Sequence, residues 1–439
     1  MISLGQRIAA RQSGVSVLET GDIPIGAMEL ANSAPSPTVG LHPAVSIRNT
    51  DALLRVLAAH DGHAEAILLL SADLPAATAA ALMAKAGATV LISDREDLAE
   101  AILPGSAVVQ RAGPAPPIRE TAWIMTTSGT TGRPKMVAHS LDRLACTVRT
   151  VASPGPVWGL TYEATRFAGM QVLLQAVLGG GTLVAPPLSL PLGERLAWFA
   201  RRGVSHLSAT PTLWRRILMH PSSSELALRQ ITLGGEIADQ PLLDRLAAQF
   251  PEARITHIYA STEIGVGFSV KDGREGFPAA WLDEAPGDIS MRVADGRLWL
   301  WAPRSGDMLG AEQLSRDSEG HVDSLDRVEL RGDRVVFLGR DTGVVNVGGA
   351  KVHPETVERT LLAFVGVAMV RVMARKNPFS GAILVAEVLP DPVPEDPDRF
   401  RTELIRHCRN NLPPEAVPAL VKLVEAIETN AAGKLTRRN

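Results

Sequence analysis

The stretch TTSGTTGRPKMVAHS, residues 126–140, carries the most specific pattern in this sequence, and it directly follows a short apolar run, AWIMT (122–126). Gly129 and Gly132 stand among five hydroxyl residues, and Lys135 comes soon after. Small residues let the backbone curl so that amides and hydroxyls point inward, which suits a polyphosphate. The common phosphate loop has four residues between its glycines and Ser or Thr after the lysine, and this segment has neither. It therefore predicts a phosphate-binding loop of a different type, rather than a polar surface loop.

Around this loop, short apolar runs alternate with helix-like stretches. Such alternation predicts mostly parallel sheets covered by helices. The expected strands are 66–70, 88–92, 122–126, 181–186, 206–210, 230–235 and 254–260. The expected helices are 76–86, 170–178, 212–220 and 241–249.

The pattern changes after about residue 285. Residues 288–302 alternate around a DG turn and residues 328–340 around RGD, which predicts antiparallel hairpins. A Gly-rich stretch (343–354) then leads into a compact α+β unit with strands near 366–374 and 382–389 and a helix near 400–411. The sequence thus predicts an α/β protein with a large N-terminal domain (1–340), which includes a β-rich subdomain at about 285–340, and a small C-terminal domain (343–439).

Composition excludes several classes of protein. Of 439 residues, 46% are hydrophobic and 21% are charged, with a net charge of −3, so the chain is not disordered, collagen-like or a coiled coil. The balanced charge gives no electrostatic footprint for nucleic acid. The most apolar region, 64–93, is broken by Asp73, Pro75 and Lys85, so no membrane span is expected. Two cysteines, and no apolar stretch of signal-peptide length at the start, favour a reducing, cytoplasmic location.

Three further segments carry candidate chemistry. IYASTEIG (258–265) ends an apolar run, so its polar residues lie at the strand edge where open α/β sheets bind ligands. Within it, Glu263 is a carboxylate that can hold magnesium. Asp326 and Arg340 stand on opposite strands of one expected hairpin, and Lys434 lies on a Gly-containing turn five residues from the end. A helix cap, a surface ion pair and a basic frayed tail are the alternatives for the three segments taken singly.

In this order, the four segments resemble the adenylate-forming superfamily of acyl-CoA synthetases, nonribosomal-peptide adenylation domains and beetle luciferase. The resemblance covers roughly residues 50–439, and TLGGEIADQPLLDRLAAQFP (232–251) resembles the family's adenine-side segment. In that family a carboxylate attacks the α-phosphate of ATP, which gives acyl-AMP and pyrophosphate. A thiol of coenzyme A or of a carrier-protein pantetheine then displaces AMP.

The resemblance implies roles for individual residues. The β- and γ-phosphates would be held by Thr127, Ser128, Gly129, Thr130, Thr131, Gly132 and Lys135. Thr262 would contact the α-phosphate, Glu263 would bind magnesium, and Lys434 would bridge the substrate carboxylate and the α-phosphate. The adenine would be flanked by Gly235, Glu236, Tyr259 and Ala260, and the ribose would be held by Asp326 and Arg340.

The resemblance also implies that the small C-terminal domain is mobile, with a hinge at 341–342. One state brings Lys434 to the site, and the other presents the thiol-side loop with Gly348, Gly349 and Lys351. Three features depart from the family pattern. Thr342 replaces the usual Asp or Lys at the hinge, Ala260 replaces the usual Gly, and only 125 residues precede the loop, which indicates a shortened N-terminus.

The sequence says less about which carboxylic acid is the substrate. The family often has His-x-x-Gly near the acyl pocket, and the matching stretch here, 161–175, contains Phe167 and Gly169. Phe167 favours an apolar acyl or aryl group, unless it is simply a core residue. No acidic partner for a substrate ammonium is evident in 206–214, which disfavours amino acids. Fatty, aryl and small branched acids remain open.

The resemblance therefore implies an acid–thiol ligase that uses ATP, magnesium and coenzyme A on a small carboxylic acid. The alternatives are a stand-alone adenylation enzyme that loads an acyl carrier protein, and a non-catalytic descendant that binds a nucleotide. No catalytic role is expected for His139, His257 or His353, because a carboxylate is already ionised at neutral pH. The oligomeric state stays open, a homodimer included.

Overall fold

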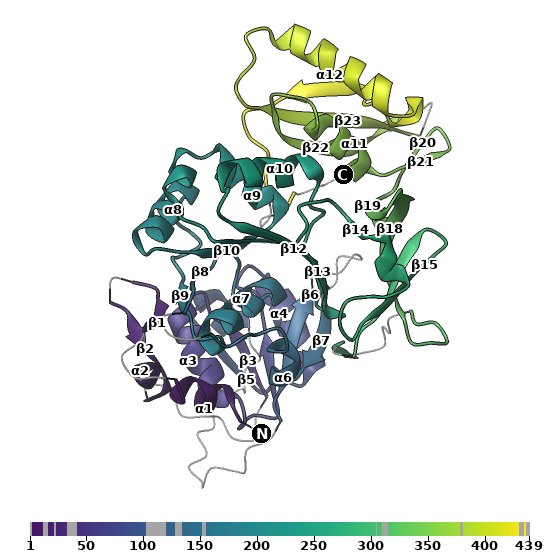
Figure 1. Ribbon diagram of the computed structural model, residues 1–439. Coiled ribbons are helices and arrows are strands. Elements are labelled where there is room, and N and C mark those ends of the chain that lie inside the picture. Colours follow the sequence, from purple (N-terminus) through teal and green to yellow (C-terminus); the bar gives the residue numbers. More distant parts are fainter. Residues whose placement is uncertain are drawn as a thin grey trace.

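The computed structural model describes residues 2–11, 16–21, 23–32, 42–101, 120–127, 134–151, 155–303, 305–309, 315–377, 381–429 and 434–435. Its architecture is the predicted α/β fold. Two mostly parallel sheets with their helices and a β-rich subdomain form the large N-terminal part, and a small α+β unit packs above it (Figure 1). No helix within the described parts of the chain is long and apolar enough to cross a membrane.

The first sheet holds the strand that leads into the phosphate loop. Its order is β17-β7-β6-β4-β3-β5. The strands are β3 (Pro43–Ser46), β4 (Ala66–Leu69), β5 (Val90–Ser93), β6 (Ala122–Thr127), β7 (Lys135–His139) and β17 (Asp307–Leu309). Helices α3 (Thr50–His60), α4 (Ala76–Ala86) and α5 (Glu96–Ala101) lie between these strands along the chain. β7 runs antiparallel to β6, so Lys135 opens a strand opposite Thr127.

The second sheet has eight strands in the order β13-β12-β11-β10-β8-β9-β1-β2. The strands are β1 (Ser16–Glu19), β2 (Ile25–Gly26), β8 (Val157–Gly159), β9 (Thr182–Val184), β10 (His206–Ala209), β11 (Gln230–Gly234), β12 (Arg254–Ser261) and β13 (Gly265–Val270). The helices that follow along the chain are α7 (Phe167–Leu178), α8 (Leu192–Arg201), α9 (Pro211–Met219) and α10 (Gln240–Gln249). β8 to β12 pair in parallel, and β13 closes the edge antiparallel to β12.

Antiparallel hairpins form the β-rich subdomain, as predicted from their turns. Its sheet contains β14 (Phe277–Pro278), β15 (Ser290–Ala294), β16 (Arg297–Trp301), β18 (Val322–Arg331) and β19 (Arg334–Arg340). Asp295 and Gly296 join β15 to β16 with φ values of 51° and 69°. Positive φ at both central residues is the geometry for which an Asp-Gly turn is selected.

The C-terminal unit follows a short 3₁₀ turn, Asp341–Gly343. It contains β20 (Val345–Val347), β21 (Ala350–Val352), α11 (Pro354–Leu362), β22 (Val367–Asn377), β23 (Gly381–Pro390), α12 (Pro397–Asn411) and β24 (Leu420–Leu423). Val357, Leu361, Val372 and Leu404 are fully buried in its own core. The domain limits 1–340 and 343–439, with the 3₁₀ turn as hinge, remain our proposal.

Gly169 shows how α7 is seated against the chain before it. A Cβ at this position would lie 2.1 Å from the carbonyl oxygen of Glu163 and 2.9 Å from Ala164 Cα. Neither backbone atom can move away cheaply. We therefore expect Gly169→Ala to lower the free energy of unfolding by about 1–3 kcal/mol, the usual cost of overpacking. Urea unfolding measures this change, and Gly26→Ala, where a Cβ would meet nothing within 4 Å, is the matched control. Equal effects of the two substitutions would contradict the packing argument.

Candidate active site

One cavity of about 1520 Å³ collects most of the candidate residues that the structure describes. Its lining comes from the carboxyl ends of β6, β11 and β12, from β18 and β19, from the start of α7 and from the C-terminal end of the chain. The candidates that line it are Thr127, Lys135, Phe167, Gly235, Glu236, Tyr259, Ala260, Thr262, Glu263, Asp326, Arg340 and Lys434. Ser128, Gly129, Thr130, Thr131 and Gly132 lie outside the described residues.

The expected phosphate side of the cavity is lined by polar groups. The Thr127 hydroxyl oxygen is buried and has no hydrogen-bond partner among the described residues. The Glu263 carboxylate follows β12 and lines the same cavity. A buried hydroxyl without a partner is costly, so it indicates a ligand that completes it. A hydroxyl, the Lys135 ammonium and a carboxylate fit a polyphosphate with its magnesium ion.

A second group of side chains joins the hairpin of the β-rich subdomain to β12. Arg340 Nε donates to Asp326 Oδ1 at 2.9 Å, and the Tyr259 hydroxyl donates to Asp326 Oδ2 at 2.5 Å. The hairpin pairs Asp326 directly with Arg340 in register. The Tyr259 ring stacks between Phe268 and Phe337, with centroids 5.1 and 5.3 Å away. Burial and the neighbouring Asp326 raise the pKa of Tyr259 well above its ordinary value, so the phenol stays a donor.

The C-terminal lysine reaches this cavity from the small domain. A Cβ on Gly235 would lie 3.2 Å from Lys434 Cε and 3.4 Å from Nζ, so the lysine packs directly on the glycine. The Leu435 amide donates to Glu236 Oε1 at 3.3 Å, and Glu236 Oε2 accepts from the Thr212 amide in the first turn of α9 at 2.9 Å. Burial lowers the pKa of Lys434, and Glu236 opposes that shift. Glu236 thereby links the last described residues of the chain to the large domain.

The thiol-side candidates lie elsewhere. Gly348, Gly349 and Lys351 are exposed in the β20–β21 hairpin and do not line the cavity. Thr342 is exposed in the 3₁₀ turn, and the preceding Asp341 is bonded to Arg327. The structure thus brings Lys434 to the cavity and leaves the Gly-rich hairpin outside it.

Phe167 and Gly169 differ in position. Phe167 begins α7 and lines the cavity, whereas Gly169 is buried in the helix and does not line it. The close backbone packing described above accounts for the glycine. Arg166, three residues before Gly169, does line the cavity, at the place where the family pattern has histidine. The three-residue spacing from Gly169 is the sequence signal for Arg166, whereas Phe167 lies one position off the pattern.

Arg166 ties the start of α7 to the loop after β4. Its Nη2 donates to both Asp73 oxygens at 2.9 Å, and its Nε donates to Glu163 at 3.1 Å. Glu163 also accepts from the Ser71 hydroxyl and the Ala72 amide. The arginine and the two carboxylates therefore form one local network that positions the cavity wall.

His139 is a second residue whose place the sequence did not reveal. Its Nε2 lies 2.8 Å from the carbonyl oxygen of Thr262, and its ring centroid is 5.8 Å from that of Phe167. Burial lowers the pKa of His139, so at neutral pH the ring is neutral and Nε2–H donates to this carbonyl. His139 thus positions the Thr262–Glu263 segment. The fold brings the two together, and no sequence motif links them.

We expect His139→Leu to lower kcat of acyl-AMP formation about tenfold, because the Thr262 carbonyl loses its donor and the segment loosens. His139→Gln, whose amide can donate at nearly the same place, should recover most of that loss. Pyrophosphate release at saturating ATP measures both. A glutamine variant as slow as the leucine variant would contradict a positioning role.

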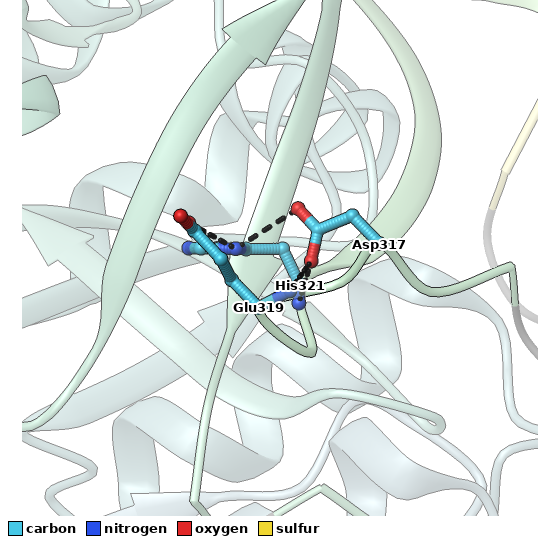
Figure 2. Close-up of side chains that lie close together, drawn as sticks. All are labelled: Asp317, Glu319 and His321. Atoms are coloured by element: carbon cyan, nitrogen blue, oxygen red, sulfur yellow. Dashed lines mark hydrogen bonds and ion pairs between the residues drawn. The ribbon is translucent and has the colours of Figure 1, made fainter.

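A separate cluster in the β-rich subdomain contains residue types that commonly bind metal ions. Asp317, Glu319 and His321 bring their ligand atoms within 4.8 Å of one another (Figure 2). Asp317 accepts from the Glu319 and His321 amides and pairs with Arg292 at 2.8 Å. His321 has one ring nitrogen 3.1 Å from Asp317 and the other 2.8 Å from the Ser290 hydroxyl. These internal bonds account for the cluster as a structured turn before β18.

The chain matches the AMP-binding enzyme family over residues 51–296 and the C-terminal domain of AMP-binding enzymes over residues 356–434. The first match alone covers more than half of the chain, and both matches agree with the fold and the cavity. The chain therefore belongs to the AMP-binding enzyme family, in the adenylate-forming superfamily. The resemblance stated from the sequence is confirmed.

Individual relatives are distant. An isonitrile lipopeptide synthase of Streptomyces coeruleorubidus is 27% identical over 356 residues, 72% of this chain, and the match spans only 23% of that protein. The benzoate–CoA ligase of Thauera aromatica is 25% identical over 372 residues, 78% of this chain and 69% of the ligase. The solved structure of the anthranilate CoA ligase AuaEII with anthranoyl-AMP has a TM-score of 0.78 at 15% identity, with 99% of this chain and 95% of that chain covered. That likeness shows the shared fold.

Proposed function

We propose that this chain forms an acyl-AMP from a small carboxylic acid and ATP and then transfers the acyl group to the thiol of coenzyme A. The observation that carries the proposal is the position of Lys434. This lysine, near the C-terminal end of the chain, packs on Gly235 in the same cavity as the Asp326–Arg340–Tyr259 cluster. A cation at the end of a small domain, placed beside this cluster, suits a reaction that brings two anions together.

The proposed roles follow from the groups that face the cavity. Asp326 accepts from the ribose hydroxyls, while Arg340 and Tyr259 hold its carboxylate in place. Gly235, Glu236, Tyr259 and Ala260 flank the adenine. Thr127 and Lys135 hold the terminal phosphates with the residues of the loop, and Thr262 holds the α-phosphate. Lys434 neutralises charge between the α-phosphate and the attacking carboxylate.

Glu263 is the residue that would hold magnesium. A bound magnesium ion would neutralise phosphate charge as pyrophosphate leaves. The residues present fit this ion, since the carboxylate lines the same cavity as Thr262 and Thr127. His139 would keep that carboxylate in position through the Thr262 carbonyl.

Transfer to the thiol requires Lys434 to leave and the exposed Gly348–Gly349–Lys351 hairpin to approach. We propose that the C-terminal domain (343–439) rotates about Asp341–Thr342 to make this exchange. The similarity to the benzoate–CoA ligase, most of whose length the chain matches, supports coenzyme A as the acceptor. The match to an isonitrile lipopeptide synthase supports the alternative, a carrier-protein pantetheine.

The test is pyrophosphate release from ATP and magnesium across a panel of fatty, aryl and amino acids, with and without coenzyme A, with the products identified by mass. Acyl-CoA from one class of acid would support the proposal. Acyl-AMP that accumulates regardless of coenzyme A would favour a carrier-protein acceptor. No pyrophosphate from any acid would contradict the proposal.

A further inference from the structure

Three neighbouring parallel strands of the second sheet each begin with a polar, an apolar and a polar residue. They read HLSA in β10, QITLG in β11 and RITH at the start of β12. The apolar positions Leu207 and Ile231 are fully buried in the core that this sheet shares with α8, α9 and α10. Parallel strands covered on both faces are normally apolar throughout. The polar set on the other face therefore faces something other than core.

The register places these polar residues side by side. His206, Gln230 and Arg254 are paired across the three strands in one row. Ser208, Thr232 and Thr256 are paired in the next row, nearer the carboxyl ends. All six residues line the cavity that contains Lys434, and Gln171 and Gln175 of α7 also line it. This part of the cavity floor is polar, although Phe167 at its wall favoured an apolar acid.

A hydrogen-bond chain fixes which groups on this floor donate. Arg254 Nε, which can only donate, lies 2.6 Å from Gln230 Oε1, and this contact sets the orientation of the amide. The Gln230 amide nitrogen then lies 3.2 Å from both the Thr232 and the Thr256 hydroxyl oxygens, and 2.9 Å from the Ile231 carbonyl. The amide nitrogen shares two hydrogens among these three acceptors and cannot itself accept, so toward Gln230 each threonine hydroxyl can only accept. Each threonine thus keeps its own hydroxyl hydrogen available to donate.

Arginines lie beside the first polar row. Arg149 and Arg254 line the cavity, and Arg229 lies close to His206. Burial, with Arg254 and Arg229, lowers the pKa of His206 to about 4, so the ring is neutral at neutral pH. Neither polar row contains a carboxylate. Asp73 and Glu163, which line the cavity at the start of α7, are bonded to Arg166.

We propose that the substrate acid carries a second oxygen acceptor, a hydroxyl or a carboxylate, at the end remote from its activated carboxylate, and that Thr232 and Thr256 donate to it. This inference rests on the proposed function and names the substrate class. Thr232 precedes Gly235 by three residues, roughly 10 Å along a strand, and Lys434 packs on Gly235. That span suits a para-substituted aryl acid or a short dicarboxylic acid.

The experiment compares matched acids. Benzoate is set against 4-hydroxybenzoate and terephthalate, and hexanoate against adipate. Binding is measured by calorimetry with magnesium and a non-hydrolysable ATP analogue, so that it does not depend on turnover, and kcat/KM by pyrophosphate release. We expect the oxygen-bearing member of at least one series to be favoured tenfold or more, because a site built to bond an oxygen leaves its donors unpaired with the analogue that lacks it. The hydroxyl and carboxylate members separate a neutral from an anionic group.

The variants locate the discrimination. Thr232→Val together with Thr256→Val keeps the shape of both side chains and removes both donors. The ratio of kcat/KM for the oxygen-bearing acid to that for the plain acid should therefore fall to nearly one. Thr232→Ser with Thr256→Ser keeps the hydroxyls and should retain the preference. Plain acids that bind as well as their oxygen-bearing partners, or a preference unchanged in the valine variant, would overturn the inference. A preference in binding without any pyrophosphate release would instead overturn the proposed function alone.

Discussion

Replacing Lys434 with alanine is expected to lower acyl-AMP formation at least a hundredfold and to leave thioester formation from preformed acyl-AMP nearly unchanged. The first half-reaction brings a carboxylate to a polyphosphate, and Lys434 is the cation that the C-terminal end of the chain supplies there. A fixed charge in a site that excludes water commonly contributes a factor of 100 to 1000. The second half-reaction needs the lysine to leave, so its removal should not slow that step. Pyrophosphate release and the conversion of synthetic acyl-AMP by coenzyme A measure the two halves separately.

Lys422→Ala is the matched control, because Lys422 is an exposed lysine on β24 of the same small domain. It should alter neither half-reaction. Loss of both half-reactions in the Lys434 variant, with unfolding behaviour unchanged, would contradict the two-state role of the small domain. Equal slowing by the Lys422 variant would show that the effect belongs to the domain and not to the site.

The pH dependence of acyl-AMP formation is a second test of the role of Lys434. Burial lowers the pKa of Lys434 from its ordinary value of 10.5, while Glu236 opposes the shift. A lysine with a lowered pKa loses its charge at a lower pH. The rate of acyl-AMP formation should therefore begin to decline, on the alkaline side, at a pH below 10.5. Lys434→Arg keeps the charge at high pH and should move that limb upward, whatever its effect on the maximal rate. An alkaline limb at the same pH in both proteins would assign it to another group.

The sequence predicted the framework well where local patterns determine it. The helices at 76–86 and 241–249 lie within one residue of α4 and α10, and the DG turn predicted the β15–β16 hairpin. Asp326 and Arg340 lie on either side of the second predicted hairpin, and a register shift between Arg327 and Val328 pairs them directly. These features depend on residues that are close in sequence.

The parts that the sequence did not reveal depend on contacts between distant segments. His139 and Thr262 are 123 residues apart, and only the fold brings the ring to the carbonyl. Arg166 joins Asp73 across 93 residues in the same way. The polar row of β10, β11 and β12 was visible as alternation, but its meaning needed the parallel register and the helices on the opposite face. Sequence patterns located the candidate motifs, whereas the shape and polarity of the cavity floor came from the structure.

Asp326→Ala is expected to lower kcat/KM for ATP about a hundredfold, mainly through KM. Both Asp326 oxygens are engaged, one by Arg340 and the other by Tyr259, so the carboxylate is held in one orientation before a nucleotide binds. A preorganised carboxylate discriminates strongly for ribose hydroxyls, because its charge roughly doubles the strength of the hydrogen bonds it accepts. For Asp326→Asn, kcat/KM for ATP should lie between the values of the wild type and of Asp326→Ala. Tyr259→Phe should lower kcat/KM less than either Asp326 substitution, since it removes only one of the two groups that hold the carboxylate.

The control for this experiment comes from the same hairpin. Asp333 lies in its turn and pairs with Arg274 at 2.8 Å, but both side chains are largely exposed. Exposed pairs contribute little, so Asp333→Ala should leave KM for ATP unchanged. Using 2′-deoxy-ATP and 3′-deoxy-ATP in place of ATP tests the ribose assignment directly, because loss of a hydroxyl should cost the wild-type enzyme far more than it costs the Asp326→Ala variant. Equal penalties in the two proteins would mean that Asp326 does not contact the ribose, and that its bonds to Arg340 and Tyr259 serve only to join the β-rich subdomain to β12.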